Sequence, residues 1–248
     1  MDPKPISPVA VQGLSKSFGE QTILAGIDFQ LEPGQVTCVL GRSGTGKSVL
    51  LKLLIGLEKP DSGSIQLAGH QITEAPLGEL NEARKKVGFL FQQAALYDSL
   101  TIEENVAFPL RRHTKLSASE RREKVHLLLG SVGLDRDLDK MPADISGGMR
   151  KRVGLARALA LDPSIVMFDE PTAGLDPISA AEIAKLILDL RDQRHITSIV
   201  VTHDLHTTRA IADRLIVLKD RKILFDGTLR EFDQSEDPFI RQFLKDAV

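Results

Sequence analysis

The sequence predicts an α/β fold with three parts: a core built on a parallel sheet, an N-terminal antiparallel β subdomain and an inserted helical lobe. Short apolar runs alternate with segments of helical periodicity, which favours the core. The runs at 36–40, 164–168 and 197–201 are apolar almost throughout, as are parallel strands covered on both faces. From about residue 94 to about residue 160 helical patterns replace the β patterns. We therefore expect a single domain over 1–248, with the helical lobe at about 94–160.

The first forty residues are predicted to be mostly β. "VAVQGL" at 9–14 is typical of one short strand. The stretch "GIDFQLEPGQVTCVL" at 26–40 alternates apolar and polar residues, contains a Pro-Gly pair and ends in an apolar run. We expect it to form a hairpin. "DSGSIQLAGHQI" at 61–72 predicts a second turn and pair of strands, and "VGFLF" at 87–91 a buried strand.

The predicted helices carry recognisable end signals. The segment from Ser48 has apolar residues at helical spacing and should end near Gly56. In the lobe, Ser117 and Glu120 have the spacing of a capping box, and Gly133 is a typical stop. The charged run "RRHTKLSASERREK" is interpreted as a solvated surface.

The C-terminal third returns to β–α alternation. A helix is expected over 177–193, with Asp176 as its cap and Pro177 in its first turn. The stretch 214–227, "RLIVLKDRKILFDG", should close as a hairpin.

Composition excludes several classes of protein. The net charge of −2, the aromatic content of 4% and the lack of Trp argue against a nucleic-acid partner. A lone cysteine, Cys38, cannot form an internal disulfide and is expected to be a small core residue. The start at 1–13 has three prolines and no apolar stretch, unlike a signal peptide. No apolar run reaches the ~18 residues of a membrane span, so any membrane partner must be another chain.

One motif predicts a phosphate-binding loop. "GRSGTGKS" at 41–48 matches G-x-x-x-x-G-K-[ST] between a strand and a helix, the context of a P-loop NTPase core. Its backbone N–H groups would surround phosphates, Lys47 would reach the β and γ phosphates of ATP, and the Ser48 hydroxyl would bind Mg²⁺. The residues predicted to bind the nucleotide are Gly41, Arg42, Ser43, Gly44, Thr45, Gly46, Lys47 and Ser48.

Polar residues at the ends of three other strands complete a predicted site for hydrolysis. Asp169 and Glu170 end the run "SIVMFDE", where Asp169 can hold Mg²⁺ through water and Glu170 can orient or deprotonate the attacking water. Gln92 follows "VGFLF" and His203 follows "SIVVT". Ligands of open parallel sheets lie beyond the carboxyl ends of the strands, so we expect these side chains to converge on one triphosphate.

A second anion site is predicted at "SGGM", 146–149. Glycine disfavours a helix interior, yet two glycines follow Ser146 at a predicted helix start. Backbone N–H groups left open at such a start attract anions. This stretch has no lysine of its own, so it corresponds to half of a phosphate site.

These motifs, in this order, resemble the ATP-binding subunits of ABC transporters along almost the whole chain. "GRSGTGKS" resembles Walker A, "SIVMFDE" Walker B and "ISGGM" the signature LSGGQ, with Ile145 and Met149 as departures. Gln92 matches the Q-loop, "AGLD" at 173–176 the D-loop and His203 the switch histidine. The resemblance implies catalytic roles for Gln92 and His203. It also implies that Gln92 binds Mg²⁺ together with Ser48 and Asp169.

The resemblance also implies how the second anion site is used. In this family two subunits pair head to tail, and the signature helix of one closes over the ATP on Walker A of the other. Ser146, Gly147 and Gly148 would then contact the partner's nucleotide, and Asp176 would lie at the dimer seam. Phe18 stands where the family has an aromatic that stacks on adenine, and phenylalanine still offers a π face.

A narrower similarity links the chain to the ATPases of Mla/Mce-type lipid transport systems. It is carried by "LFQQAALYDSLTIEENVAFPLRRHT", "SGGM" and "DPFIRQFL". It implies a homodimer on the cytoplasmic face of the inner (plasma) membrane, an integral-membrane permease, an MCE-domain lipid-binding protein and a phospholipid or related cargo. The loop from Gln92 through Tyr97 would dock the permease's coupling helix.

Three alternatives stay open or weak at this point. An ATPase for import of a polar solute, such as an amino acid, would have the same fold. A dimerising ATP switch that signals to a membrane partner without transport is compatible with every motif. A P-loop kinase is disfavoured, because kinases have no use for "ISGGM" or for His203.

Overall fold

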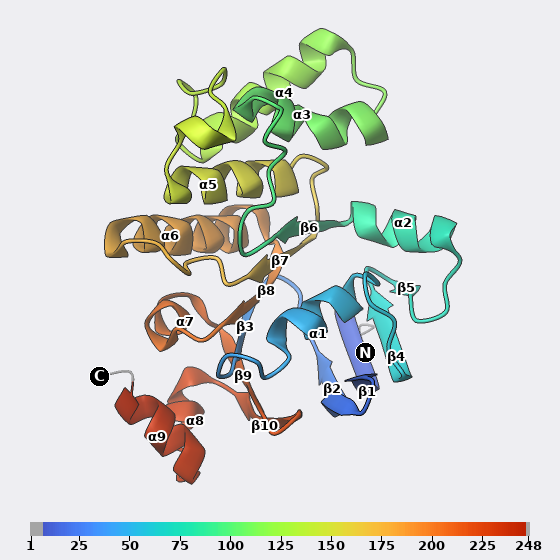
Figure 1. Cartoon of the computed structure of the whole chain (residues 1–248), viewed down its shortest axis with the longest axis vertical. Helices are drawn as coiled ribbons and strands as arrows, with labels where there is room; N and C mark the ends of the chain where they lie inside the picture. The colour runs from blue at the N-terminus through green and yellow to red at the C-terminus, as the bar shows by residue number, and fades with distance from the viewer. Residues whose placement is uncertain (1–6, 247–248) are drawn as a thin grey trace, which may run out of the picture.

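The computed structural model describes residues 7–246 and contains two sheets flanked by helices. Residues 1–6, which hold part of the start judged unlike a signal peptide, and residues 247–248 lie outside the described residues. Figure 1 shows the helices α3, α4 and α5 at one end of the molecule and the C-terminal helices at the other. None of the described helices combines the length and apolar character that a membrane crossing requires.

The larger sheet has the strand order β10-β9-β3-β8-β7-β6. Its inner pairs are parallel, and only β10 runs antiparallel, against β9, so the predicted C-terminal hairpin is confirmed. β6 lies at one edge of this sheet and is half-buried rather than fully buried. The strands are β3 (Val36–Leu40), β6 (Val87–Leu90), β7 (Ile165–Asp169), β8 (Thr197–Thr202), β9 (Arg214–Lys219) and β10 (Lys222–Gly227).

The smaller sheet is antiparallel, with the order β2-β1-β4-β5. Its strands are β1 (Val9–Phe18), β2 (Gln21–Gln30), β4 (Ser62–Leu67) and β5 (His70–Gln71). The predicted strand pair at 61–72 is confirmed, and β1 is longer than the short strand expected there.

The hairpin predicted over 26–40 is wrong. β2 pairs with β1, whereas β3 belongs to the other sheet, between β8 and β9. The burial of the two strands explains this difference. β2 alternates buried and exposed residues and covers one face, while all five residues of β3 are buried, as suits the centre of a parallel sheet.

Two apolar cores lie on the two faces of the larger sheet. Alternate residues of β3 divide between them: Cys38, a free thiol, packs in one core and Val39 in the other. The Val39 core contains α1 (Lys47–Leu54), the smaller sheet and part of α2 (Leu77–Lys85). The Cys38 core contains residues of α6 (Pro177–Arg194) and α7 (Leu205–Ile211).

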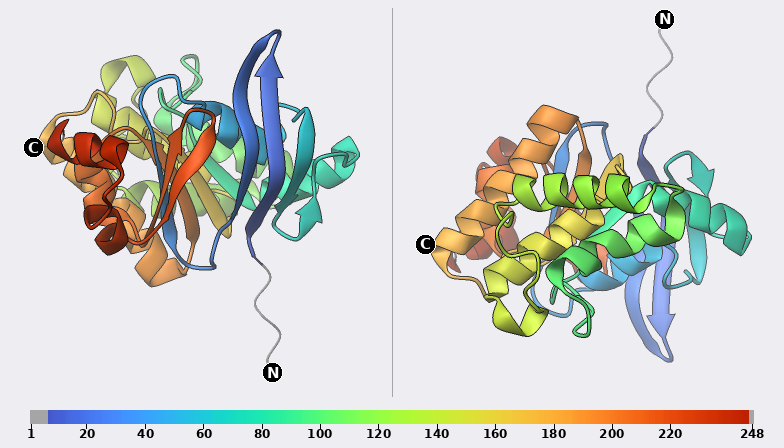
Figure 2. Two further views of the ribbon diagram at one scale, coloured as in Figure 1. Left: turned by 90° about the horizontal axis from the view of Figure 1, so that it is seen from below. Right: turned by 90° about the horizontal axis from the view of Figure 1, so that it is seen from above.

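Helices α3 (Ile102–His113), α4 (Ala118–Ser131) and α5 (Gly147–Ala158) pack against one another at the end shown in the right-hand view of Figure 2. Ser117 and Glu120 form the predicted capping box, and the chain leaves α4 through Gly133 at φ +71°. A 3₁₀ turn (Pro142–Asp144) precedes α5. The C-terminal helices are α8 (Leu229–Asp233) and α9 (Pro238–Asp246).

Candidate functional site

The loop at 41–46 joins β3 to α1 and turns through two glycines with positive φ. Gly44 has φ +79° and Gly46 has φ +96°, a region that favours glycine. A Cβ at Gly46 would lie 2.8 Å from Cγ2 of Ile23, so this position also lacks room for a side chain. The loop thus leads into the first turn of α1 with its backbone close to the smaller sheet.

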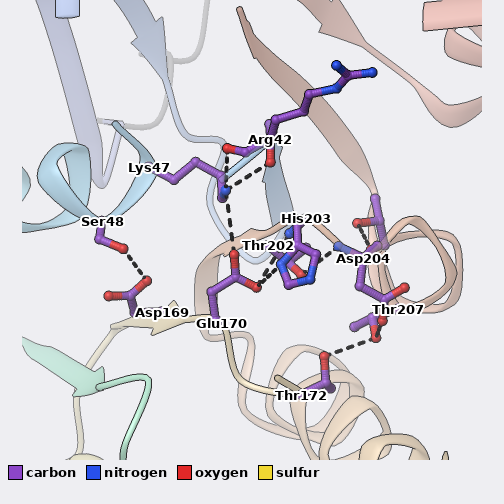
Figure 3. A network of polar contacts seen from close by, with 12 residues as sticks. Arg42, Lys47, Ser48, Asp169, Glu170, Thr172, Thr202, His203, Asp204 and Thr207 are labelled. Carbon is purple, nitrogen blue, oxygen red and sulfur yellow. Dashed lines mark hydrogen bonds and ion pairs between the residues drawn. The ribbon is translucent and has the colours of Figure 1, made fainter. Parts of the chain in front are cut away.

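Lys47, the first residue of α1, turns its side chain back toward the carbonyls of this loop and is only 6% exposed. Its ammonium donates to the carbonyl oxygens of Gly41, at 2.8 Å, and Arg42, at 3.2 Å, and lies 3.5 Å from Oε1 of Glu170 (Figure 3). A buried ammonium surrounded by oxygens is suited to binding phosphate oxygens in the same position.

Ser48 and Asp169 form a pair of hard oxygen groups beside the lysine. The Ser48 hydroxyl donates to Oδ1 of Asp169 at 2.8 Å. Burial raises the pKa of the Asp169 carboxyl, while the hydrogen bond from Ser48 opposes that rise. A hydroxyl and a carboxylate are the ligands that Mg²⁺ prefers, so these residues fit the ion.

Glu170, which follows β7, contacts side chains that follow two other strands, Lys47 after β3 and His203 after β8. Its Oε2 lies 2.9 Å from Nδ1 of His203 and accepts the backbone N–H of His203 at 3.4 Å. The backbone of Glu170 has φ +47°, an uncommon value for a residue with a side chain. Its carboxylate is buried, whereas the His203 side chain is 62% exposed and borders solvent.

Lys47, Ser48, Glu170 and His203 border one cavity of about 410 Å³, within the size range of small-molecule sites. Asp169 is not among its described lining residues and reaches it through Ser48. The cavity lining brings together Gln92, Glu170 and His203 from three separate strand ends, as the sequence predicts. The full lining is Ile23, Ser43, Gly44, Gly46, Lys47, Ser48, Val49, Gln92, Glu170 and His203. The roles of these residues toward a nucleotide stay predictions.

Two predicted nucleotide contacts, Phe18 and Arg42, lie outside the described lining of this cavity. Phe18 is 47% exposed, and the ammonium of Lys16 lies 5.1 Å from its ring centroid. The guanidinium of Arg42 points away from Glu170 in Figure 3 and lies 5.5 Å from the ring of Phe239 on α9. Among the described residues, neither side chain belongs to the lining of the cavity.

Two other predicted residues support the loop from inside. A Cβ at Gly41 would lie 2.5 Å from Oγ1 of Thr45, which leaves space for glycine alone. The Thr45 hydroxyl donates to the carbonyl of Arg42 at 3.0 Å. Both residues therefore shape the loop rather than line the cavity.

The second predicted anion site forms the first turn of α5. The hydroxyl of Ser146 accepts the backbone N–H of Met149 at 3.2 Å and caps the helix. Gly148 is buried, and a Cβ at this position would lie 3.1 Å from Oγ of Ser179. The hydroxyl of Ser179 donates to Asp176. Among the described residues that line the cavity, none comes from 146–148, and Asp176 is also outside it.

The structure brings further residues to the site that sequence reasoning missed. Lys151, on α5, is 5% exposed and donates to the backbone carbonyl of Glu170 at 2.8 Å. Arg157, on the same helix, donates to the backbone carbonyls of Ala94 and Ala95. These two alanines lie in the loop that follows Gln92, and both have a positive φ. Both cations lie in "MRKRVGLAR", after the predicted anion site, and no spacing in this stretch distinguishes them from solvated side chains.

Next to His203, hydroxyl groups bond to Asp204 on both sides of the loop that leads into α7. Oγ1 of Thr202 accepts the backbone N–H of Asp204 at 3.0 Å. The Thr207 hydroxyl donates to Asp204 and lies 3.2 Å from the hydroxyl of Thr172 (Figure 3). The only sequence signal for this network is the spacing of Asp204 as a helix cap.

Comparison with known proteins agrees with this geometry. The family model described as "ABC transporter" matches residues 24–173, more than half of the chain. A solved dimeric ATP-binding cassette, MJ0796 bound to ADP and Pi, is 33% identical, has a TM-score of 0.83 and covers 90% of this chain and 99% of its own. The structure of cbiO1 from Clostridium perfringens is 30% identical, with a TM-score of 0.84, and covers 95% of this chain and 94% of its own.

Curated relatives extend over nearly the whole chain. A "Probable ribonucleotide transport ATP-binding protein" of Mycobacterium leprae is 45% identical over 236 residues, which are 95% of this chain and 68% of that protein. For the Mycobacterium tuberculosis protein of that description the share is 66%, so the chain spans about two thirds of these relatives.

The ATP-binding protein MlaF of the intermembrane phospholipid transport system is also similar. The Haemophilus influenzae protein is 41% identical, over 96% of this chain and 90% of its own length, and the Escherichia coli K12 protein is 39% identical, over 95% and 88%. The matching family model, these identities and the shared fold show that the chain belongs to the ABC transporter family, as an ATP-binding, ATP-hydrolysing subunit.

Proposed function

We propose that this chain powers the transport of phospholipid through a separate integral-membrane permease by hydrolysing ATP. The observation that carries the proposal is the similarity to MlaF over about nine tenths of both chains, joined to a cavity lined by Lys47, Ser48, Gln92, Glu170 and His203. In this proposal the subunit is peripheral, at the cytoplasmic face of the inner membrane, and an MCE-domain protein delivers or accepts the lipid.

Within one chain, each polar group has one task toward ATP. Lys47 and the N–H groups of the loop bind the β and γ phosphates, and Ser48, Asp169 and Gln92 would hold Mg²⁺. Mg²⁺ would neutralise negative charge on the phosphates. Glu170 accepts a proton from the attacking water, and His203 orients the Glu170 carboxylate through the contact at 2.9 Å.

The nucleotide site is completed by a second copy of the chain. Ser146, Gly147 and Gly148 of one subunit would contact the γ phosphate held by Lys47 of the other, with Asp176 at the seam and Phe18 beside the adenine. Two features support this arrangement: the described lining of the cavity contains none of 146–148, and a similar cassette was solved as a dimer.

A groove next to the Gln92 loop supports the docking of a permease helix. A hollow of about 460 Å³ is lined by aromatic side chains, among them Phe89, Phe91, Tyr97 and Phe108. The rings of Tyr97 and Phe108 are in tilted contact, with centroids 4.7 Å apart and an interplanar angle of 42°. An apolar helix from a membrane partner could bury its side chains there.

A second candidate function is the import of a polar solute. The mycobacterial relatives favour it, because their description names ribonucleotide transport and their identity to this chain is 45%. A dimerising ATP switch without transport is the third candidate.

Reconstitution tests the three candidates. The subunit is purified with its membrane partners, and ATP-dependent transfer of labelled phospholipid between liposomes is measured, with the Glu170→Gln complex as the matched control. We expect transfer by the wild type and none by the variant. Uptake of ribonucleotide without lipid transfer would favour the solute importer, and ATP hydrolysis with neither would favour the switch.

A further inference from the structure

Lys151 is a buried cation for which the proposed chemistry has no role yet. It lies on α5, one and a half turns beyond the Ser146 cap, and is 5% exposed. Its ammonium donates to the backbone carbonyl of Glu170 at 2.8 Å. Buried lysines are rare unless they are paired, so this position requires an explanation in terms of its partners.

The partner is the backbone of the proposed general base, at a point where that backbone is strained. Glu170 has φ +47° and carries a side chain, a combination that persists only when its surroundings hold it. Its N–H donates to the carbonyl of Val201 at 2.9 Å, and its carbonyl accepts the N–H of Ala173 at 3.2 Å. A further hydrogen bond to this backbone comes from the ammonium of Lys151, which lies on α5.

The direction in which Glu170 points depends on that backbone. With its carbonyl turned toward Lys151, the carboxylate lies 3.5 Å from Lys47 and 2.9 Å from Nδ1 of His203. A change in the φ of Glu170 would redirect its Cα–Cβ bond relative to β7 and so displace the carboxylate from these two groups. The positive charge of Lys151 also lies near the two carboxylates, Asp169 and Glu170, which the strand end brings together.

We propose that Lys151 is a positioning residue for hydrolysis: it holds the Glu170 backbone so that the carboxylate faces the water that attacks ATP. The proposal rests on the proposed function, in which Glu170 is the base. It adds a direct tie between the helix that begins at Ser146 and the catalytic glutamate of the same chain. Lys151 itself touches neither ATP nor the attacking water.

A residue that only stabilises the fold would behave differently. Its loss would lower the melting temperature, and any effect on activity would follow the fraction of folded protein. A positioning residue lowers kcat of the folded protein while ATP binding is retained, because Lys47 and the loop still hold the phosphates. The split between kcat and KM therefore distinguishes the two roles.

The test uses four full-length variants: Lys151→Met, Lys151→Gln, Lys151→Arg and, as matched control, Arg152→Met. Arg152 is the next cation on α5, and it contacts the carbonyl of Val132 and the carboxylate of Glu182 instead of Glu170. Steady-state ATP hydrolysis, binding of a fluorescent ATP analogue and thermal unfolding are measured for each protein.

We expect kcat to fall at least tenfold in Lys151→Met, with KM and the Kd of the analogue within about threefold of wild type. Lys151→Arg, which keeps a charged donor, should recover a substantial part of kcat, and Lys151→Gln should fall between them. Arg152→Met should keep a kcat near that of wild type. If Lys151→Met does not fold, the same criteria apply to Lys151→Gln.

Three results would overturn the inference: a wild-type kcat in folded Lys151→Met, a loss of analogue binding equal to the loss of kcat, or an equal fall in kcat in Arg152→Met. A wild-type protein that binds ATP and does not hydrolyse it would instead contradict the proposed function, so the two failures can be told apart.

Discussion

The two helices that begin at glycine-rich turns differ in what surrounds their first turn. At the start of α1, Lys47 is buried and in contact with Glu170, and Ser48 is bonded to Asp169. At the start of α5, Ser146 is exposed and its hydroxyl caps its own helix by accepting the N–H of Met149. Both turns present backbone N–H groups, yet of the two only the first lies, among the described residues, at a cavity that a buried ammonium and a carboxylate line together. At the second, the guanidinium of Arg150 is engaged by the carbonyl of Ile145 at 2.7 Å, and Asp176 by the hydroxyl of Ser179.

This difference is consistent with the proposed arrangement, in which two helix starts contribute differently to one site shared between subunits. An N-terminus with open N–H groups attracts an anion, but each such group contributes modestly when water competes. The α1 start adds a buried ammonium, which in the proposed function holds phosphate within one chain. In the proposed dimer, the exposed α5 start would contact a phosphate that the other subunit already holds.

The largest expected effect is a loss of ATP hydrolysis when the proposed base beside α1 is replaced. Glu170→Gln removes the proposed base and keeps the shape of the site, so hydrolysis should fall by about 10²–10⁴-fold while ATP still binds. The variant should also accumulate as an ATP-bound dimer, measured by size-exclusion chromatography with ATP. Hydrolysis at the wild-type rate would show that Glu170 is not the base.

The next largest effect is expected from a substitution at the start of α5, which leaves the cavity at α1 unchanged. Ser146→Arg places a long side chain at the exposed helix start, so ATP-dependent dimerisation should be lost and hydrolysis should fall at least tenfold. ATP binding by the monomer should stay within about threefold of wild type, because the cavity at α1 contains no residue of 146–148 among its described lining. A parallel loss of monomer binding would mean that the signature acts within one chain.

Sequence patterns predict the α1 region well because its chemistry depends on strand ends. The phosphate loop, Asp169, Glu170 and His203 each follow an apolar strand, and the parallel sheet brings those ends together. The predicted helix caps at Ser117 and Asp176 are confirmed for a similar reason, since a cap bonds to residues two or three positions away.

The errors and omissions concern contacts between elements far apart in the chain. The predicted 26–40 hairpin failed because local alternation does not say which strand is the partner. The change from an alternating to a continuous apolar pattern at β3 was the available clue, since it marks a strand covered on both faces. The contact of Lys151 with Glu170 depends on how α5 lies against the end of β7, which no local pattern specifies.

The third prediction measures how α5 is tied to the α1 region through Lys151. Burial lowers the pKa of Lys151 from 10.5 to about 8, although the nearby Asp169 and Glu170 oppose the shift. Between those values the unfolded chain binds a proton that the folded chain does not, so stability rises with pH across this window. Relative to Lys151→Met, the wild type should gain on the order of 2 kcal/mol between pH 8 and 10.5, measured by urea unfolding.

A flat difference between the two proteins over that window would mean that Lys151 keeps an ordinary pKa when folded. It would also mean that the ammonium is better solvated than its contact with Glu170 indicates.

The smallest effect sharpens the comparison between the two glycine turns. Gly44→Ala places a Cβ at φ +79°, so it should destabilise the fold by about 1–2 kcal/mol, although nothing lies within 4 Å of that Cβ. Gly148→Ala has an ordinary φ and gains up to about 1 kcal/mol of helix propensity, offset by the contact of its Cβ with Ser179 at 3.1 Å.

The net change in stability for Gly148→Ala should therefore stay within about 1 kcal/mol. If instead Gly148→Ala destabilises more than Gly44→Ala in urea unfolding, the α5 start is held by packing against α6 rather than kept open for a ligand. That result would mean that close packing at Gly148 contributes more to stability than the positive φ at Gly44 does.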